Sequence, residues 1–184
     1  MKFLPQVIPD IILIEPTLHG DDRGYFAETF RQDLFNKAIG RNINFIQDNE
    51  SKSSKGVLRG LHYQVAPYSQ SKLVRVIQGA VMDVVVDIRK SSPTFGQHLS
   101  FELTSNNKHQ LFVPEGFAHG FVVLSDIATF SYKVDSYYAP KHERGIAYND
   151  KELKINWQLK SKILKLSNKD SINPTLANSQ DLFD

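Results

Sequence analysis

The chain has 184 residues, with 22 lysines and arginines against 20 aspartates and glutamates and a net charge of +2. This length suits a single domain, residues 1–184, and the scattered basic residues form no stripe that would indicate a nucleic-acid partner. The absence of cysteine excludes disulfides, thiolate nucleophiles and cysteine-ligated zinc, and it fits a reducing, cytoplasmic location.

The N-terminal part is expected to contain an edge strand, a turn and one helix. Prolines bracket a short apolar strand at Val7 to Ile14. The sequence DDRG at 21–24 predicts a turn. The apolar spacing then predicts a helix over Arg31 to Ile39, capped by Thr29 and ended by Gly40.

The rest of the chain is predicted to form many short strands with little helix. A polar loop is expected at SKSSKG (51–56), a helical turn near 150–153, and a loosely ordered polar tail over 171–184. Alternating or apolar runs predict strands at 56–64, 72–78, 81–88, 97–103, 110–113, 120–124 and 128–134. On the third of these, Met82, Val84, Val86 and Ile88 share one face, and Asp83 and Asp87 share the other. This series indicates an all-β sandwich or barrel.

No segment has the pattern of a membrane span or a signal peptide. The longest apolar run, Leu73 to Ile88, is interrupted by Arg75, Asp83 and Asp87, and such charges are costly in a bilayer. The N-terminal apolar run is too short for a signal-peptide core. We therefore expect a soluble cytoplasmic protein with no membrane partner.

One motif has the spacing of a metal-binding barrel but lacks the ligands. P-x-G-x-x-H, ending at His119, is similar to the second motif of the cupins, barrels that often hold a metal. The first cupin motif supplies H-x-H and a later glutamate. Here Gln64 stands two residues after His62, and Lys72 and Arg75 stand where an acidic ligand would be sought. One or two imidazoles beside a cation make a poor metal site, so the motif favours the barrel and disfavours metal-dependent oxygenase chemistry.

The stretch GVLRGLHYQ (56–64) places a histidine on the strand expected there. An extended backbone points His62 into the barrel and Arg59 the other way, unless Gly60 marks a bulge that redirects Arg59. Lys72 and Tyr132 each share a strand face with apolar residues, so they are candidates for the barrel interior as well. The alternatives are a hydrogen-bonded core histidine, a solvated lysine at a strand end and a core tyrosine.

These residue types together suit proton transfer next to a carbonyl group. A neutral histidine is a usable base, and a buried lysine or arginine stabilises developing negative charge on oxygen. A tyrosine can deliver a proton from the opposite side. Asp170 is a candidate for holding the His62 imidazole in one tautomer. The set therefore indicates removal of a proton and its return to the other face.

Seven motifs extend this interpretation to most of the chain: DDRGYF, QDNESKSSKGVLRGLHYQ, KLVRVIQG, DVVVDIRKSSPTFG, VPEGFAHGF, YKVDSYYAP and LSNKD occur in this order. Over about residues 1–170 the chain closely resembles the dTDP-4-dehydrorhamnose 3,5-epimerases. The resemblance implies an all-β, cupin-type jelly-roll barrel (a double-stranded β-helix) with a few short helices. It also implies a homodimer that needs no metal or organic cofactor.

The implied reaction is epimerisation of dTDP-4-keto-6-deoxy-D-glucose at C3 and C5, giving dTDP-4-keto-L-rhamnose for surface polysaccharide. By the same resemblance His62 is the base with Asp170 as its partner, Tyr132 is the acid, and Lys72 stabilises the enolate oxygen at C4. The substrate-binding residues that it implies are Arg23, Phe26, Glu28, Gln47, Asp48, Asn49, Arg59, His119, Tyr138, Glu143 and Lys169. The segment around Arg23 is expected to reach across the dimer and complete the partner's site.

The chain departs from the family pattern at two places, where Tyr148 stands for a common tryptophan and Gln158 for a common proline. Both concern local packing near the C-terminus. Other functions stay open: an epimerase acting at one carbon only, a 3,4-ketoisomerase, or a barrel that binds nucleotide sugars without catalysis. The intact His62 and Tyr132 favour epimerisation over these.

Overall fold

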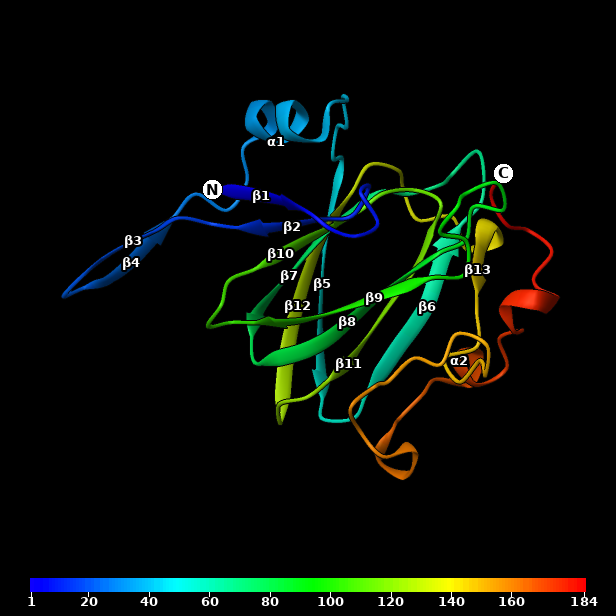
Figure 1. Cartoon of the computed structure of the whole chain (residues 1–184). Coiled ribbons are helices and arrows are strands. Elements are labelled where there is room, and N and C mark those ends of the chain that lie inside the picture. Colours follow the sequence, from blue (N-terminus) through cyan, green and yellow to red (C-terminus); the bar gives the residue numbers. More distant parts are fainter.

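The computed structural model describes residues 1–184, and two antiparallel sheets form the body of the molecule (Figure 1). The six-stranded sheet has the order β1 (Lys2–Pro5), β2 (Ile12–Glu15), β10 (Gln110–Val113), β7 (Lys72–Gln78), β12 (Ile127–Val134), β5 (Gln47–Ser54). The five-stranded sheet has the order β13 (Glu143–Gly145), β6 (Leu58–Gln64), β11 (Phe117–Val123), β8 (Ala80–Asp87), β9 (His98–Thr104). This confirms the predicted all-β class.

The main core lies between the two sheets. One buried cluster joins Val74, Leu111 and Phe130 of the six-stranded sheet to residues of the five-stranded sheet such as Val85 and Phe121. The alternation predicted for β8 is confirmed, because its other apolar face enters a second cluster on the outside of the sheet, with Met82, Val84, Val86, Ile88, Trp157 and Leu176. Strand β8 is thus buried on both faces, as its nearly continuous apolar sequence indicates.

Helix α1 (Gln32–Ile39) covers the outer face of the six-stranded sheet. Its Phe35 packs edge-on against Phe112 of β10, with ring centroids 5.1 Å apart. Gly40 ends the helix with a φ of 70°, as predicted. The predicted cap by Thr29 is wrong. The N-cap residue is Arg31, without a side-chain cap, because the carbonyl of Thr29 accepts a hydrogen bond from Gln110 Nε2 at 2.6 Å and is fixed to β10.

Two other N-terminal predictions are corrected. The expected edge strand at residues 7–14 starts only at Ile12 and lies between β1 and β10. The preceding segment turns instead, which buries Ile8 and Ile11 in the main core. The polar segment expected as a loop also differs, because Ser51 and Ser54 belong to β5 and pair with β12 along its length. Backbone pairing with one neighbour holds this edge strand, whose side chains alternate between the cavity side and solvent.

A two-stranded hairpin, β3 (Leu18–Asp21) and β4 (Gly24–Ala27), projects away from the barrel (Figure 1). Its tip is the turn that DDRG predicts, and Gly24 adopts a φ of 131° there. Arg23 pairs with Asp21 at the tip. Phe26 is 69% exposed and Tyr25 58% exposed, so the hairpin presents apolar rings to the surroundings.

The C-terminal segment from residue 140 onward is packed on the barrel, including residues 171–184, for which a loosely ordered tail is predicted. It contains the short helices η1 (Pro140–His142), η2 (Ser161–Ile163), α2 (Asn168–Ser171) and η3 (Leu176–Asn178). Leu176 is buried in the outer cluster, and its N–H donates to Asp150 at 2.7 Å. The carbonyl of Phe183 accepts from the N–H of Lys90 at 2.8 Å. The apolar side chains within this polar tail account for its order. None of the helices has the length and hydropathy that a membrane crossing requires.

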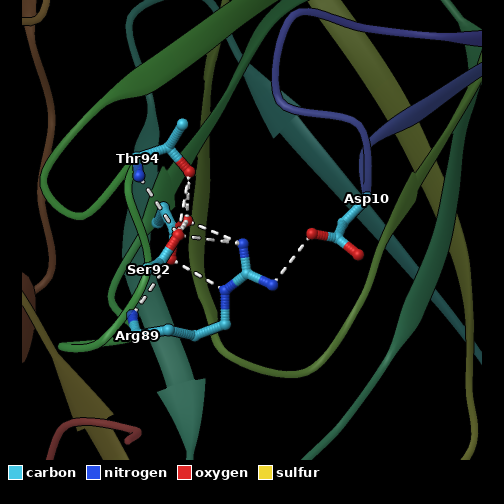
Figure 2. A network of polar contacts seen from close by, with 5 residues as sticks. Asp10, Arg89, Ser92 and Thr94 are labelled. Atoms are coloured by element: carbon cyan, nitrogen blue, oxygen red, sulfur yellow. Dashed lines mark hydrogen bonds and ion pairs between the residues drawn. The ribbon is translucent and has the colours of Figure 1, made fainter.

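The loop after β8 is fastened by a polar network that includes Asp10, Arg89, Ser92 and Thr94 (Figure 2) and the buried carboxylate of Asp87. Asp87 accepts hydrogen bonds from Arg89, Ser92 and Thr94, and Arg89 also reaches Asp10 at 2.9 Å. Burial raises the pKa of Asp87, but these hydrogen bonds outweigh burial and bring it to about 2. Because this pKa lies below that of an unfolded aspartate, the network stabilises the fold above about pH 4, and its contribution is lost as the pH falls through about 2.

Candidate active site

A cavity of about 650 Å³ opens between the two sheets. One wall comes from β5, β7 and β12, and the other from β6 and β11, while residues near β13 and α2 form its mouth. The structure brings eleven of the predicted site residues to this cavity: Gln47, Asn49, Arg59, His62, Lys72, His119, Tyr132, Tyr138, Glu143, Lys169 and Asp170.

Four predicted site residues lie elsewhere in the single chain. Arg23 and Phe26 belong to the projecting hairpin, and Glu28 follows it and is exposed. Asp48 is on the outward face of β5, where its carboxylate pairs with Lys133 at 2.9 Å. The alternation of β5 explains this difference, since Gln47 and Asn49 on either side of Asp48 point to the cavity.

Gly60 redirects Arg59 into the cavity. Its φ is 121°, and the register between β6 and β11 shifts at this point. A Cβ at Gly60 would lie 2.5 Å from the Cα of Gly120, so a larger residue does not fit. In a regular strand Arg59 and His62 would face opposite sides, but both line the cavity. Of the two alternatives for Arg59, the bulge is therefore the correct one.

His62 is paired with Asp170 from the C-terminal segment. His62 Nε2 lies 2.5 Å from Asp170 Oδ1, and the two side chains are 26% and 5% exposed. Ser167 caps the short helix α2 by accepting from the N–H of Asp170, which fixes the carboxylate. Burial raises the pKa of Asp170, but His62 outweighs it and holds the pKa below its ordinary value. A proton held on Nε2 by this carboxylate leaves Nδ1 of His62 as a proton acceptor.

Tyr132 and Lys72 enter the cavity from the opposite sheet. They lie on the neighbouring strands β12 and β7, whereas His62 lies on β6. Burial raises the pKa of the Tyr132 hydroxyl, so it stays protonated at neutral pH. Burial also lowers the pKa of Lys72 to about 8, against the attraction of Glu143 and Asp83. The cavity thus holds an imidazole on one wall, and a hydroxyl and an ammonium on the other.

A second histidine of the cavity, His119, is fixed by the carboxylate of Asp83, which is not among the predicted site residues. His119 Nε2 lies 2.9 Å from both oxygens of Asp83, and Asp83 is fully buried. Burial raises the pKa of Asp83, opposed by His119 and Lys72. The signal was present in the sequence, because Asp83 alternates with apolar residues on the inner face of β8 and an acid there needs a partner.

The mouth of the cavity is polar and cross-linked. Glu143 accepts a hydrogen bond from the Tyr138 hydroxyl at 2.6 Å and pairs with Lys169. Burial raises the pKa of Glu143, but these two partners bring it below its ordinary value. On the wall formed by β5, Gln47 Nε2 donates to Asn49 Oδ1 at 2.8 Å. Amides, a carboxylate and cations are therefore available to a polar, anionic ligand.

The side chains of the cavity do not fit the metal that cupin barrels often hold. No three histidine, aspartate or glutamate side chains lie close enough together to ligate an ion. Gln64, at the place of the second histidine of H-x-H, has its amide bonded to backbone groups instead. The two histidines of the cavity are each bonded to a carboxylate.

The fold and the cavity define a cupin-type barrel equipped for acid–base chemistry on a polar ligand. The profile of the family described as dTDP-4-dehydrorhamnose 3,5-epimerase matches residues 5–178. The chain is 54% identical over 164 residues to such an epimerase from Shigella flexneri, covering 89% of this chain and 91% of that protein. The chain belongs to the dTDP-4-dehydrorhamnose 3,5-epimerase family. It is an isomerase-class enzyme for a sugar nucleotide.

Solved structures agree with this assignment and with the predicted cupin-type fold. A dTDP-6-deoxy-D-glucose-3,5-epimerase from Legionella pneumophila, solved in complex with dTDP-4-keto-L-rhamnose, superposes with a TM-score of 0.93 at 45% identity, covering 97% of this chain and 94% of that one. ChmJ, a 3'-monoepimerase from Streptomyces bikiniensis in complex with dTDP-quinovose, gives a TM-score of 0.87 at 36% identity, covering 94% and 87%.

Proposed function

We propose that the chain epimerises dTDP-4-keto-6-deoxy-D-glucose at C3 and C5 to dTDP-4-keto-L-rhamnose. The observation that carries this proposal is the placement of His62 and Tyr132 on opposite walls of one cavity. Inversion requires that a proton leaves one face of a carbon and returns to the other. The names of the relatives and the ligand of the Legionella enzyme support the choice of substrate. The enzyme is proposed to work in the cytoplasm, supplying rhamnose for surface polysaccharide.

The reaction is divided among four residues. His62, oriented by Asp170, removes the proton next to the C4 ketone. The Lys72 ammonium stabilises the negative charge that develops on the C4 oxygen. Tyr132 then donates its hydroxyl proton to the opposite face of the carbon. Before the second carbon reacts, His62 releases the proton that it took up to solvent, and the Tyr132 phenolate takes one up from solvent. The same cycle at the second carbon then completes the double epimerisation.

The remaining cavity residues are proposed to hold the nucleotide. Arg59 is suited to bidentate contact with a phosphate, and Lys169 adds a compact charge at the mouth. Tyr138, which is 55% exposed, offers a ring face on which the thymine base can stack. Gln47, Asn49, His119 and Glu143 supply hydrogen bonds to the sugar and base. Asp48 is not included in this set, because it faces out of the cavity and pairs with Lys133.

Incubation with dTDP-4-keto-6-deoxy-D-glucose in deuterated water tests the proposed reaction. We expect deuterium at both C3 and C5, because His62 serves each carbon in turn. Nuclear magnetic resonance of the product locates the label. Deuterium at one carbon only would contradict the double epimerisation and favour the activity for which ChmJ is named. A product with the ketone at C3 would indicate a ketoisomerase, and no exchange at all would indicate a binding barrel.

The site is proposed to be shared between the subunits of a homodimer. Arg23 and Phe26 belong to a hairpin that projects away from the barrel (Figure 1), and neither residue lines the cavity of its own chain. Exposed rings on such a projection suit contact with a second copy of the chain. A two-fold axis would then place each hairpin at the partner's cavity, where Arg23 and Glu28 add to nucleotide binding.

Mixing two inactive variants tests this arrangement. An Arg23→Ala chain and a His62→Ala chain, allowed to exchange subunits, should recover about a quarter of wild-type activity. Half of random dimers are mixed, and each mixed dimer has one site with Arg23 and His62 intact. Arg59→Ala mixed with His62→Ala is the matched control, because both residues line the same chain's cavity and no site is restored. Mixed dimers that are seen by mass measurement but stay inactive would show that Arg23 acts within its own chain.

A further inference from the structure

Gln64 is the last residue of strand β6, and its side-chain amide makes three hydrogen bonds to backbone groups. Its side chain is 3% exposed, and Nε2 donates to the carbonyls of Tyr68 at 2.7 Å and Tyr137 at 3.2 Å. Its Oε1 accepts from the N–H of Ala139 at 2.7 Å. Two carbonyls and one N–H fix the orientation of the amide, since only the NH₂ group can donate to both carbonyls. One side chain therefore ties two loops at the cavity mouth to the sheet.

Two of the hydrogen bonds of Gln64 go to the backbone on either side of Tyr138. The carbonyl of Tyr137 and the N–H of Ala139 belong to the peptide groups on either side of the Tyr138 Cα. A single amide that binds both groups restrains the backbone dihedrals of Tyr138. The far end of the side chain is restrained too, because its hydroxyl donates to Glu143, which lies opposite Gln64 in the β6–β13 register. Tyr138 is thus restrained at its backbone and at its hydroxyl group, although the residue is more than half exposed.

We infer that Gln64 is a positioning residue that presents the Tyr138 ring to the nucleobase of the substrate. The inference rests on the proposed role of Tyr138 in binding thymine. A ring on an exposed loop would lose conformational freedom when a base stacks on it, and Gln64 removes that freedom before the ligand arrives. The position where a metal-binding cupin carries its second histidine thus serves nucleotide recognition in this chain.

The test measures binding of dTDP by calorimetry together with steady-state kinetics. Gln64→Met keeps the length of the side chain and removes all three bonds. It should weaken dTDP binding about fivefold to tenfold and raise KM, with kcat within about twofold of wild type. Gln32→Met is the matched control, since Gln32 is half-buried and its Nε2 donates to the carbonyl of Ile43 at 2.5 Å, away from the cavity. It should leave dTDP binding unchanged.

A double-variant cycle separates this inference from the role of Tyr138. Tyr138→Ala should weaken dTDP binding by itself, and adding Gln64→Met should weaken it no further. If Tyr138→Ala binds dTDP like wild type, the proposed role of Tyr138 is wrong and the inference falls with it. If Tyr138→Ala weakens binding but Gln64→Met does not, or if the two effects multiply, Gln64 is not a positioning residue for Tyr138.

A second variant covers the case in which Gln64→Met does not fold. Gln64→Glu keeps the shape of the side chain and the acceptor for Ala139, but it sets a carboxylate against the carbonyls of Tyr68 and Tyr137. It should weaken dTDP binding as Gln64→Met does, with kcat preserved. Circular dichroism at the assay temperature establishes that each variant is folded. Unchanged dTDP binding in folded Gln64→Glu would overturn the inference.

Discussion

Replacing His62 by alanine is expected to abolish deuterium exchange at both C3 and C5 and to lower turnover by at least about 10² to 10⁴. His62 is the histidine of the cavity that Asp170 orients, and no other base is assigned to either carbon. Tyr132→Phe should behave differently. It removes the acid on the opposite wall, so epimerisation slows, but a proton can still leave and return on the face of His62.

The control for this prediction is the second histidine. His119 is likewise bonded to a carboxylate, that of Asp83 at 2.9 Å, and it is more deeply buried than His62. His119→Ala should raise KM while exchange at both carbons persists, because His119 is assigned to binding. Exchange and product formation are followed in the same deuterated samples. Equal loss of both in His62→Ala and Tyr132→Phe would contradict the separate roles of base and acid, and loss of exchange in His119→Ala alone would move the base to His119.

The local sequence pattern was sufficient to predict strands with alternating or largely apolar residues. The ranges predicted for β7 and β10 agree with the structure, and the two faces of β8 were assigned correctly. The end of α1 at Gly40 followed from one residue type in the left-handed region. In each case the information lies within a few neighbouring residues, so the pattern specifies the structure directly.

The wrong predictions concern segments whose structure depends on contacts with residues far away in the sequence. Strand β5 is polar, and only its pairing with β12 makes Ser51 to Ser54 extended. Thr29 does not cap α1 because Gln110, far along the chain, binds its carbonyl. The tail looked loose by composition, yet Leu176 finds a place in the outer core cluster. The periodicity of apolar residues within a segment does not reveal contacts with residues so far away in the sequence.

In the candidate site, too, some features could be predicted from the sequence and others depend on distant contacts. Most of the residues that resemblance to the family implies lie in one cavity, but Arg23, Phe26, Glu28 and Asp48 do not. Alternation alone would have turned Arg59 away from that cavity, and the bulge at Gly60 reverses it. The sequence places Asp83 on the face of β8 opposite Met82 and Val84, but it does not show that this face is the inner one or that His119 on β11 lies beside Asp83.

Replacing Lys72 by methionine is expected to lower kcat by about 10² to 10³, because the charge on the enolate oxygen loses its stabilising cation. Methionine keeps much of the apolar stem, so the packing beside β12 changes little. Lys169→Met is the matched control. Lys169 lines the same cavity but pairs with Glu143 at the mouth, so its loss should raise KM and leave kcat nearly unchanged.

The pH dependence provides an independent measurement of the same role. Burial lowers the pKa of Lys72 to about 8, so the ammonium is present below that pH and is lost as the pH rises through it. Wild-type kcat should therefore fall above about pH 8. Tyr132 does not cause this fall, since burial raises the pKa of its hydroxyl. Lys72→Arg, whose charge persists at alkaline pH, should lose the fall even though its geometry lowers kcat.

Two results would reject this assignment. A fall near pH 8 that survives in both Lys72→Met and Lys72→Arg would have to come from another group. An effect of Lys72→Met on KM alone would make Lys72 a binding residue, because uniform binding changes KM without changing kcat. The base on the opposite wall would then act without a cation from β7, and the enolate oxygen would depend on another cation of the cavity lining, such as Arg59, for its stabilisation.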